Sequence, residues 1–255
     1  MQINGSSILV TGASGGLGTA MCQELARRGA RLVITARREA LLADLAAETG
    51  AEVLVADLTD RDDLLRVAER AGACDVLVAN AGVGNDPSLA ELTDESIDFS
   101  IDVNLRAPIV LATHLARSHQ QAGTEGQIVL IGSLAGLAAT PGTRMYNATK
   151  FGLRGFALSF RQDLEGTGVG CSLVAPGFIR DAGMFAEGDL VLPPGVRTNT
   201  PADVAAGVVR AITANPMEVY VSPPEMRAVS TLATMAPAFS AFVQRKLNVS
   251  ERTDR

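Results

Sequence analysis

Several residue types are scarce in this 255-residue chain, and each scarcity narrows the kind of protein it encodes. The three cysteines, Cys22, Cys74 and Cys171, are an odd number without CxxC spacing, so we expect buried thiols in a reducing compartment rather than a disulfide framework. The only two histidines, His114 and His119, lie five positions apart in a predicted helix and point in different directions. No metal site is therefore expected.

The charge balance argues against a general nucleic-acid-binding protein. The chain carries 22 basic and 28 acidic residues, a net charge of −6, whereas general nucleic-acid binding needs a basic face. The N-terminus does not combine a basic segment with an apolar one, so we expect no signal peptide and a cytoplasmic location. With 47% hydrophobic residues, a chain of this length can bury a sizeable core.

The stretch Ala228–Gln244 contains no charged residue, but it is short for a membrane span and is interrupted by Pro237. Two interpretations stay open. The stretch is either a helix that packs on its own domain or on another subunit, or an interfacial helix that contacts a membrane peripherally, helped by Arg245 and Lys246.

Short apolar runs alternate with helical patterns along the chain, which predicts βαβ units and a parallel sheet. The expected strands are Ser7–Thr11, Leu32–Thr35, Glu52–Ala56, Val76–Ala79, Gln127–Ile131, Gly170–Val174 and Glu218–Val221. The expected helices are Gly16–Arg28, Arg38–Glu48, Arg61–Arg70, Ser96–Gln121, Met145–Glu165 and Pro201–Ala214. No linker divides the chain, so residues 1–255 are predicted to form one domain, with a functional loop at about 178–200 and a C-terminal helical extension at about 224–247.

Three glycines follow the first predicted strand and open the first predicted helix. Gly12, Gly16 and Gly18 let the backbone approach a pyrophosphate, which the N–H groups of the helix start would bind. Where NAD sites usually place Asp or Glu, after the second strand, the chain has Arg37 and Arg38. Because Arg suits a 2′-phosphate, this predicts NADP (NADPH) over NAD, unless both arginines are merely solvated at a helix start.

Two polar residues stand at the ends of the next two strands. Asp57 either accepts a hydrogen bond from the adenine amino group or caps the following helix, for which Asp60 is better placed. Asn80, which precedes Ala81 and Gly82, either contacts the cofactor or braces the carboxyl edge of the sheet, where open sheets bind ligands.

Tyr146 and Lys150 lie four residues apart in a predicted helix, so their side chains share one face. A free phenol, with a pKa of about 10, is a poor acid–base catalyst at neutral pH. A neighbouring ammonium group stabilises the phenolate and lowers that pKa. The pair is therefore a candidate acid–base group, with Ser133 thirteen residues upstream.

Together these residues resemble the short-chain dehydrogenase/reductase family, in its shorter single-domain branch. The resemblance covers nearly the whole chain, and its motifs occur in the family order: Thr11-Gly12-x-x-x-Gly16-x-Gly18, Asn80-Ala81-Gly82, Asn104, Ser133, Tyr146-x-x-x-Lys150 and Pro176-Gly177. It implies an α/β fold with a Rossmann-like, doubly wound parallel sheet of about seven strands and helices on both faces. It also implies a homodimer or homotetramer that forms through the helices at 96–121 and 145–165.

The resemblance implies roles for four residues. Tyr146 would be the general acid in reduction and the base in oxidation, and Lys150 would lower its pKa and bind the nicotinamide ribose. Ser133 would hold the substrate oxygen, and Asn104 would hold a water in a proton relay unless it bonds only to backbone. The implied cofactor-binding set is Gly12, Ser14, Gly16, Leu17, Gly18, Arg37, Arg38, Asp57, Leu58, Asn80, Ala81, Gly82, Tyr146, Lys150, Pro176, Gly177 and Ile179.

The chain departs from the family pattern at one point. A threonine often follows the Pro-Gly pair and binds the nicotinamide carboxamide, but this chain has Phe178-Ile179-Arg180-Asp181. Asp181 either replaces that threonine or points to solvent with Arg180 as its partner, while Ile179 could supply backbone contacts.

The implied activity is an NADP-dependent interconversion of a carbonyl and a secondary alcohol. The substrate pocket is expected between residues 83–89, 134–143 and 178–200. Its apolar candidates, Leu134, Leu137, Ala138, Ala139, Phe178, Met184, Phe185, Leu190 and Leu192, predict a hydrophobic substrate such as an acyl chain, a sterol-like ring or an aromatic carbonyl. Two alternatives stay open: a cofactor-binding regulator without turnover, and a membrane-peripheral reductase of lipids or acyl chains.

Overall fold

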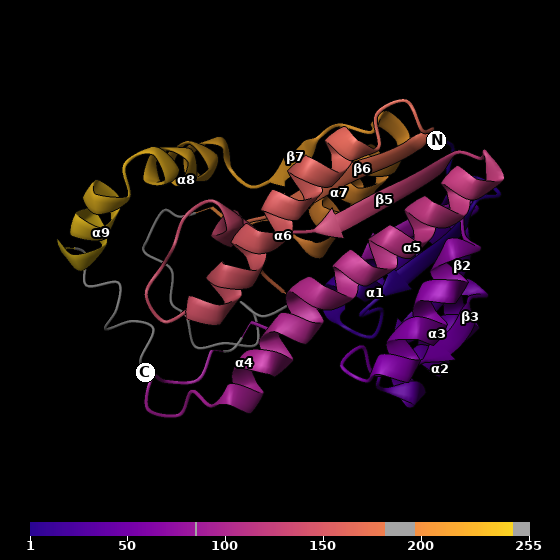
Figure 1. Ribbon diagram of the computed structural model, residues 1–255, viewed down its shortest axis with the longest axis horizontal. Helices are drawn as coiled ribbons and strands as arrows, with labels where there is room; N and C mark the ends of the chain where they lie inside the picture. The colour runs from indigo at the N-terminus through magenta and orange to yellow at the C-terminus, as the bar shows by residue number, and fades with distance from the viewer. Residues whose placement is uncertain (85, 182–196, 247–255) are drawn as a thin grey trace.

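A seven-stranded parallel sheet forms the centre of the computed structural model, which describes residues 1–84, 86–181 and 197–246 (Figure 1). The strands are β1 (Ser7–Thr11), β2 (Arg31–Ala36), β3 (Glu52–Val55), β4 (Val76–Ala79), β5 (Gly126–Ile131), β6 (Val169–Pro176) and β7 (Glu218–Val221). Their order in the sheet is β3-β2-β1-β4-β5-β6-β7, and each neighbouring pair is parallel. The predicted Rossmann-like fold is confirmed.

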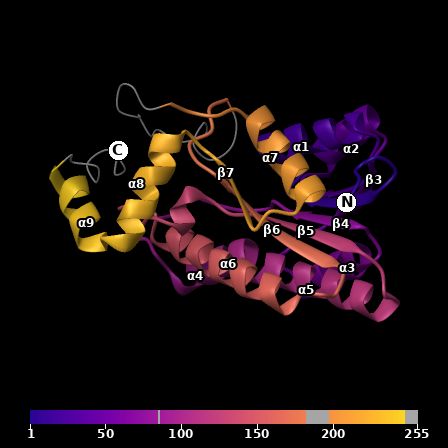
Figure 2. The same ribbon diagram turned by 90° about the horizontal axis from the view of Figure 1, so that it is seen from above.

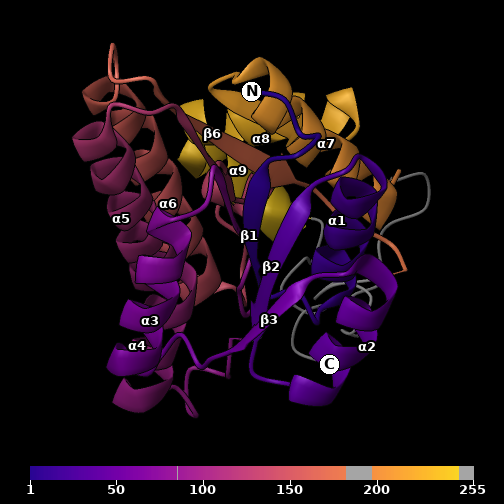
Figure 3. The same cartoon turned by 90° about the vertical axis from the view of Figure 1, so that its right-hand side faces the viewer.

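Helices cover both faces of the sheet, which explains why the strands are nearly continuous runs of aliphatic residues. Along β1, Ile8 and Val10 belong to one core and Leu9 to the other. One face is covered by α1 (Gly16–Arg27), α2 (Glu39–Thr49) and α7 (Pro201–Ala214) (Figure 3). The opposite face is covered by α3 (Arg61–Gly72), α5 (Ala107–Ala122) and α6 (Arg144–Asp163).

The connection between β4 and β5 corrects one prediction. A single helix was expected over Ser96–Gln121, but the chain forms α4 (Asp94–Ile101), a π-helical turn (Asp102–Arg106) and then α5. The hydrogen bonds of a π turn span one residue more than those of an α-helix, and such turns are frequent at functional sites. This turn contains Asn104, one of the candidate catalytic residues.

The C-terminal extension consists of two helices, α8 (Pro224–Met235) and α9 (Pro237–Lys246), which lie beyond the end of the sheet (Figures 1 and 2). The hydroxyl of Thr234 donates to the carbonyl of Leu137, and the amide of Gln244 donates to the carbonyl of Ala139. Several apolar side chains on these helices are exposed, namely Val229, Leu232, Met235, Phe239 and Phe242. Among the helices of the described ranges, none is both long and apolar enough to cross a membrane.

The carboxyl ends of the parallel strands lie at one edge of the sheet, and the strand order reverses between β1 and β4. Open α/β sheets bind ligands at such a switch point. Gly12 follows β1 and Asn80 follows β4, while Ser133 and Gly177 follow β5 and β6. The topology therefore brings residues from four separate sequence motifs to the same edge.

Candidate active site

The glycines after β1 form a cradle in which the backbone leaves no room for side chains. Gly12 has a φ of +64°, and a Cβ atom there would lie 2.8 Å from the Cα of Ala81. A Cβ at Gly18 would lie 2.2 Å from the carbonyl oxygen of Gly12. Helix α1 begins directly after Gly15, and no side chain caps its first N–H groups. This arrangement fits a pyrophosphate, because the free N–H groups and the positive end of the helix dipole face the cradle.

Asn80 braces the carboxyl edge, as one of the two interpretations predicted. Its amide nitrogen donates to the carbonyl oxygens of Thr11 at 3.0 Å and Gly12 at 3.2 Å. In return, the hydroxyl of Thr11 accepts from the backbone N–H groups of Asn80 and Ala81, both at 3.0 Å. These bonds tie the end of β4 to the end of β1 and so fix the shape of the cradle.

The two arginines after β2 occupy different places. Arg38 donates to the backbone oxygen of Ser14 at 2.8 Å and thus reaches over the glycine-rich segment. The guanidinium of Arg37 lies 3.9 Å from the carboxylate of Asp57 and 5.9 Å from the ring centroid of Phe99, and 60% of its side chain is exposed. Arg37 is therefore accessible to a ligand phosphate at the carboxyl end of β2.

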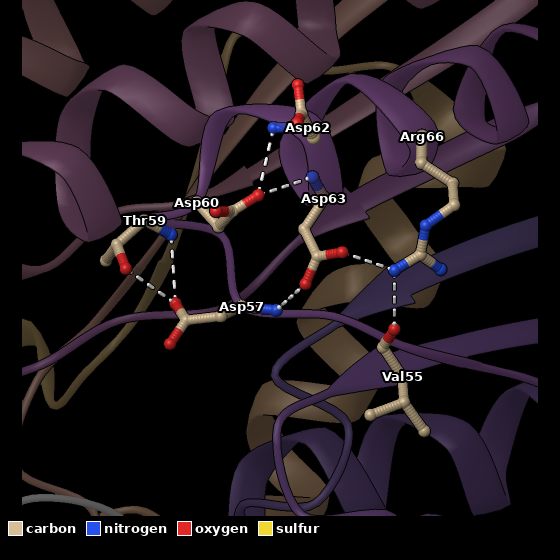
Figure 4. A network of polar contacts seen from close by, with 7 residues as sticks. All are labelled: Val55, Asp57, Thr59, Asp60, Asp62, Asp63 and Arg66. Carbon is tan, nitrogen blue, oxygen red and sulfur yellow. Dashed lines mark hydrogen bonds and ion pairs between the residues drawn. The ribbon is translucent and has the colours of Figure 1, made fainter.

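Asp57 is not the cap of α3, and Asp60 is (Figure 4). The carboxylate of Asp60 accepts from the N–H groups of Asp62 at 3.0 Å and Asp63 at 2.9 Å. The carboxylate of Asp57 instead accepts from the backbone and hydroxyl of Thr59. One of its oxygens is thus held by Thr59 and the other faces Arg37. The neighbouring Leu58 is buried.

Ser133 and Tyr146 meet at the start of α6. The two side chains are hydrogen-bonded, and the phenol is partly buried. Burial raises the pKa of Tyr146, and the hydrogen bond to Ser133 lowers it by a smaller amount. The net fall in the pKa of Tyr146 that was expected from Lys150 does not occur in the protein by itself, because loss of solvent around the phenol outweighs the hydrogen bond to Ser133.

Lys150 lies one helical turn beyond Tyr146 and is buried. Its ammonium donates to the carbonyl oxygen of Ile131 at 2.9 Å and lies 5.6 Å from the ring centroid of Tyr146. Burial disfavours the charged form and lowers the pKa of Lys150 to about 8. The ammonium form therefore predominates at neutral pH, close to the phenol but directed toward the end of β5.

Asn104 joins the π turn to the loop after β4. Its side chain accepts from the N–H of Val83 and donates to the carbonyl of Val83, both at 2.8 Å. It also donates to the hydroxyl of Thr149 at 3.3 Å, so its contacts are not restricted to backbone. A Cβ at Gly82 would lie 3.2 Å from Asn104 and 3.7 Å from the Lys150 ammonium. Gly82 therefore lies between the two side chains.

The segment after β6 shows where the side chain of Asp181 points. Its backbone has a φ of +70°, 70% of its side chain is exposed, and its carboxylate lies 3.4 Å from Arg180. Of the two alternatives, this agrees with the one in which Asp181 points to solvent with Arg180 as its partner. Gly177 donates to the carbonyl of Val221 at 3.0 Å, and Ile179 is buried beside Asn199. Met184, Phe185, Leu190 and Leu192 lie outside the described residues.

Asn147 organises the predicted pocket wall at 134–143, a role that the sequence did not reveal. Its amide donates to the carbonyls of Ala135 at 2.8 Å and Ala138 at 3.1 Å, and its oxygen accepts from the N–H of Thr140. Leu134 and Leu137 on this wall are buried. The available signal was a polar residue in the interior of the first turns of a helix, where Asn is disfavoured unless it bonds to nearby backbone.

The geometry agrees with comparisons to known proteins. A family model described as short chain dehydrogenase matches residues 6–189. This chain belongs to the short-chain dehydrogenase/reductase family. It is 32% identical over 182 residues to the 3-oxoacyl-[acyl-carrier-protein] reductase FabG of Rickettsia conorii. The alignment covers 71% of this chain and 75% of the relative. It is also 35% identical over 214 residues to the 3-oxoacyl-[acyl-carrier-protein] reductase MabA of Mycobacterium bovis. That alignment covers 80% of this chain and 83% of the relative.

A solved structure extends the similarity over most of the chain. The short-chain dehydrogenase of Sphingobium yanoikuyae, in complex with NADPH, superposes with a TM-score of 0.76 at 28% identity. The alignment covers 94% of this chain and 95% of that one. The protein is thus an oxidoreductase of a family that uses nicotinamide cofactors.

Proposed function

We propose that this protein uses NADPH to reduce the carbonyl group of a hydrophobic substrate to a secondary alcohol, and that it catalyses the reverse oxidation with NADP. The observation that carries the proposal is the convergence of Ser133, Tyr146 and Lys150 beside the glycine cradle at the carboxyl edge of the sheet. The cofactor would supply the hydride, so the chain has to orient the carbonyl and provide a proton.

Tyr146 is the group that donates this proton. Because burial raises its pKa, the phenol stays protonated at neutral pH and is ready to act as a general acid. The hydroxyl of Ser133, which is already bonded to the phenol, can hold the same substrate oxygen. The ammonium of Lys150 favours the phenolate that forms when the proton leaves. Asn104 contacts the hydroxyl of Thr149 and the loop at Val83, where a water in a proton relay would be held.

The cofactor-binding residues that we propose are those predicted from the sequence. The cradle at Gly12, Gly16 and Gly18 would hold the pyrophosphate, and the exposed Arg37, with Arg38 beside Ser14, would bind the 2′-phosphate. The carboxylate of Asp57, which faces Arg37, would accept a hydrogen bond from the adenine amino group. NADPH in the structure from Sphingobium yanoikuyae supports the choice of the phosphorylated cofactor.

The substrate class rests on two supports. The described pocket wall contains the buried Leu134 and Leu137, and the relatives named above are described as reductases of 3-oxoacyl groups. A 3-oxoacyl thioester is therefore the first substrate to test, followed by apolar ketones with rings. Turnover of a sugar or a charged metabolite, with none on any apolar carbonyl, would overturn the hydrophobic assignment.

The decisive experiment separates binding from turnover. NADPH and NADH are titrated by fluorescence against the wild type and Tyr146→Phe, and both proteins are then assayed with the carbonyl panel. We expect Tyr146→Phe to bind NADPH normally and to lose about 10²- to 10⁴-fold in rate, the usual contribution of a general acid. A wild type that binds NADPH but reduces no carbonyl would instead favour a regulator without turnover.

A second candidate function, a membrane-peripheral reductase of lipids, is favoured by the exposed apolar side chains of α8 and α9 and by Arg245 and Lys246 in the last turn of α9. Vesicles of anionic lipid are sedimented with the wild type and with the double variant Leu232→Glu/Phe239→Glu. Co-sedimentation of the wild type alone supports this candidate, and a wild type that stays in the supernatant rejects it.

We place the reaction in the cytoplasm, where Cys22, Cys74 and Cys171 would remain free thiols. We expect the protein to be a homodimer or homotetramer, which light scattering would measure.

A further inference from the structure

Helix α6, which carries Tyr146 and Lys150, begins without a cap from its own sequence. The N-cap residue, Thr143, makes no side-chain bond to the helix backbone, and the first turn contains no acidic residue. The hydroxyl of Thr143 is used elsewhere, in bonds to the side chain of Asn147 at 2.6 Å and to the carbonyl of Thr140. The first N–H groups of a helix need acceptors from outside, so α6 requires another partner.

Asp86, in the loop after β4, supplies the missing acceptors. One carboxylate oxygen accepts from the N–H of Met145 at 2.5 Å and the other from the N–H of Tyr146 at 3.1 Å. The carbonyl of the next residue, Pro87, accepts from the guanidinium of Arg144. Three consecutive residues of the catalytic helix are thus fastened to two consecutive residues of a loop almost sixty positions upstream.

The same loop is connected to Tyr146 by a second route. The hydroxyl of Thr149 donates to the carbonyl of Tyr146 at 3.0 Å and accepts from the side chain of Asn104. Asn104 in turn holds both backbone groups of Val83, three residues before Asp86. The backbone of Tyr146 is therefore held at its N–H by Asp86 and at its carbonyl by Thr149. Both routes lead back to the loop that is expected to line the substrate pocket.

We propose that Asp86 is a positioning residue for Tyr146: its carboxylate caps α6 from outside, holds the phenol in register with Ser133 and fixes residues 86–87 of the predicted pocket wall against the catalytic helix. The proposal rests on the proposed function in so far as Tyr146 is the general acid. Catalysis depends on the placement of such a group, and a displacement of about 1 Å can cost about 100-fold in rate. Asp86 bonds to the start of α6 and not to α1 or Arg37, which would hold the phosphates, so cofactor affinity should depend on it much less than kcat does.

A matched control exists in α3. Asp60 caps that helix through two backbone N–H groups, as Asp86 caps α6, but it lies beyond β3 and holds no catalytic residue (Figure 4). Asp60→Ala and Asp86→Ala should therefore lower the Tm by similar amounts. Asp86→Asn keeps one accepting oxygen and should retain part of the cap.

The first test compares kinetics. We expect Asp86→Ala to lower kcat for a reducible carbonyl by about 10- to 100-fold while the Kd for NADPH changes less than about 2-fold. Asp86→Asn should recover at least part of the lost kcat, and Asp60→Ala should keep the wild-type kcat. A kcat for Asp86→Ala within 2-fold of the wild type, or an equal loss in Asp60→Ala, would overturn the proposal.

The second test needs no turnover, so it can still be carried out and interpreted if the proposed enzymatic function is wrong. The chain has two tyrosines and no tryptophan, so in a Tyr220→Phe background Tyr146 is the sole source of tyrosine fluorescence. We expect acrylamide quenching of this fluorescence to rise in Asp86→Ala and to stay unchanged in Asp60→Ala, because only the former frees the first turn of α6. Equal quenching in all three proteins would reject Asp86 as a positioning residue, whatever the enzyme reduces.

Discussion

The ammonium of Lys150 donates a hydrogen bond of 2.9 Å to the carbonyl oxygen of Ile131, the last residue of β5. This bond anchors a buried cation between the catalytic helix and the carboxyl edge of the sheet. Ser133 follows two residues later, so the same strand end positions the lysine and the serine. The arrangement favours catalysis, but it places a charge where solvent cannot stabilise it.

The first prediction concerns the cost of that charge. Burial lowers the pKa of Lys150 from 10.5 to about 8, so below pH 8 the folded protein carries a poorly solvated ammonium. We expect Lys150→Met to abolish activity and yet raise the free energy of unfolding at pH 7 by about 1–3 kcal/mol, less the lost bond to Ile131.

The pH dependence of this gain has a defined sign. Between the folded pKa of about 8 and the unfolded pKa of 10.5, the unfolded lysine binds a proton and the folded one does not, so wild-type stability rises with pH. The advantage of Lys150→Met should therefore shrink from pH 8 to pH 10.5 in urea unfolding. An advantage that is constant with pH would show that burial does not disfavour the ammonium.

The second prediction concerns the phenol of Tyr146. Burial raises its pKa, and the hydrogen bond from Ser133 lowers it. Ser133→Ala should therefore raise the pKa further, which moves the alkaline rise of the oxidation rate to higher pH because oxidation needs the phenolate. Ultraviolet titration in the Tyr220→Phe background measures the shift directly. Ser159→Ala, on the exposed side of α6, is the control and should leave the titration unchanged.

The third prediction concerns cofactor choice. A guanidinium that bonds to a 2′-phosphate contributes about 1.5–3 kcal/mol, so Arg37→Ala should weaken NADPH binding by about 10- to 100-fold. The Kd for NADH should hardly change, since NADH lacks that phosphate. Arg66→Ala removes an arginine bonded to Asp63 and Val55 and should affect neither cofactor (Figure 4). Equal losses for NADPH and NADH would contradict the assignment of Arg37.

The sequence was sufficient to predict the elements whose structure is determined by hydrophobic periodicity and local motifs. The strands at Ser7–Thr11, Val76–Ala79 and Glu218–Val221 were predicted to the residue, because buried parallel strands are short aliphatic runs between turn signals. Asp60 was recognised as the better cap of α3 from its position alone. Topology then brought the motifs to one edge, as the order of the strands requires.

Features that depend on contacts between distant residues could not be predicted in this way. The π turn at Asp102–Arg106 has the composition of an ordinary helix, and only its tertiary contacts through Asn104 distinguish it. The cap of α6 by Asp86 joins residues about sixty positions apart, and no local signal marks it. The pKa of Tyr146 was predicted to fall because the sequence displays the neighbouring lysine but not the burial of the phenol.

The last prediction contrasts two glycines that lie in helices. At Gly18 a Cβ would meet the carbonyl oxygen of Gly12 at 2.2 Å and the Cα of Ala13 at 2.7 Å, which are backbone atoms that cannot rotate away. Gly155, on the exposed side of α6, has no atom within 4 Å of its Cβ position. Gly155→Ala should therefore stabilise the protein by about 0.5–1 kcal/mol, since alanine favours a helix.

Gly18→Ala should do the opposite. It forces α1 away from the end of β1, so we expect a loss of about 1–3 kcal/mol in stability and a large loss of NADPH affinity. Chemical unfolding and fluorescence titration measure the two effects. The pair of variants separates the shape of the cradle from helix propensity, because both replace glycine by alanine within a helix. Normal NADPH binding by Gly18→Ala would mean that the close approach of α1 to β1 is not what shapes the pyrophosphate site.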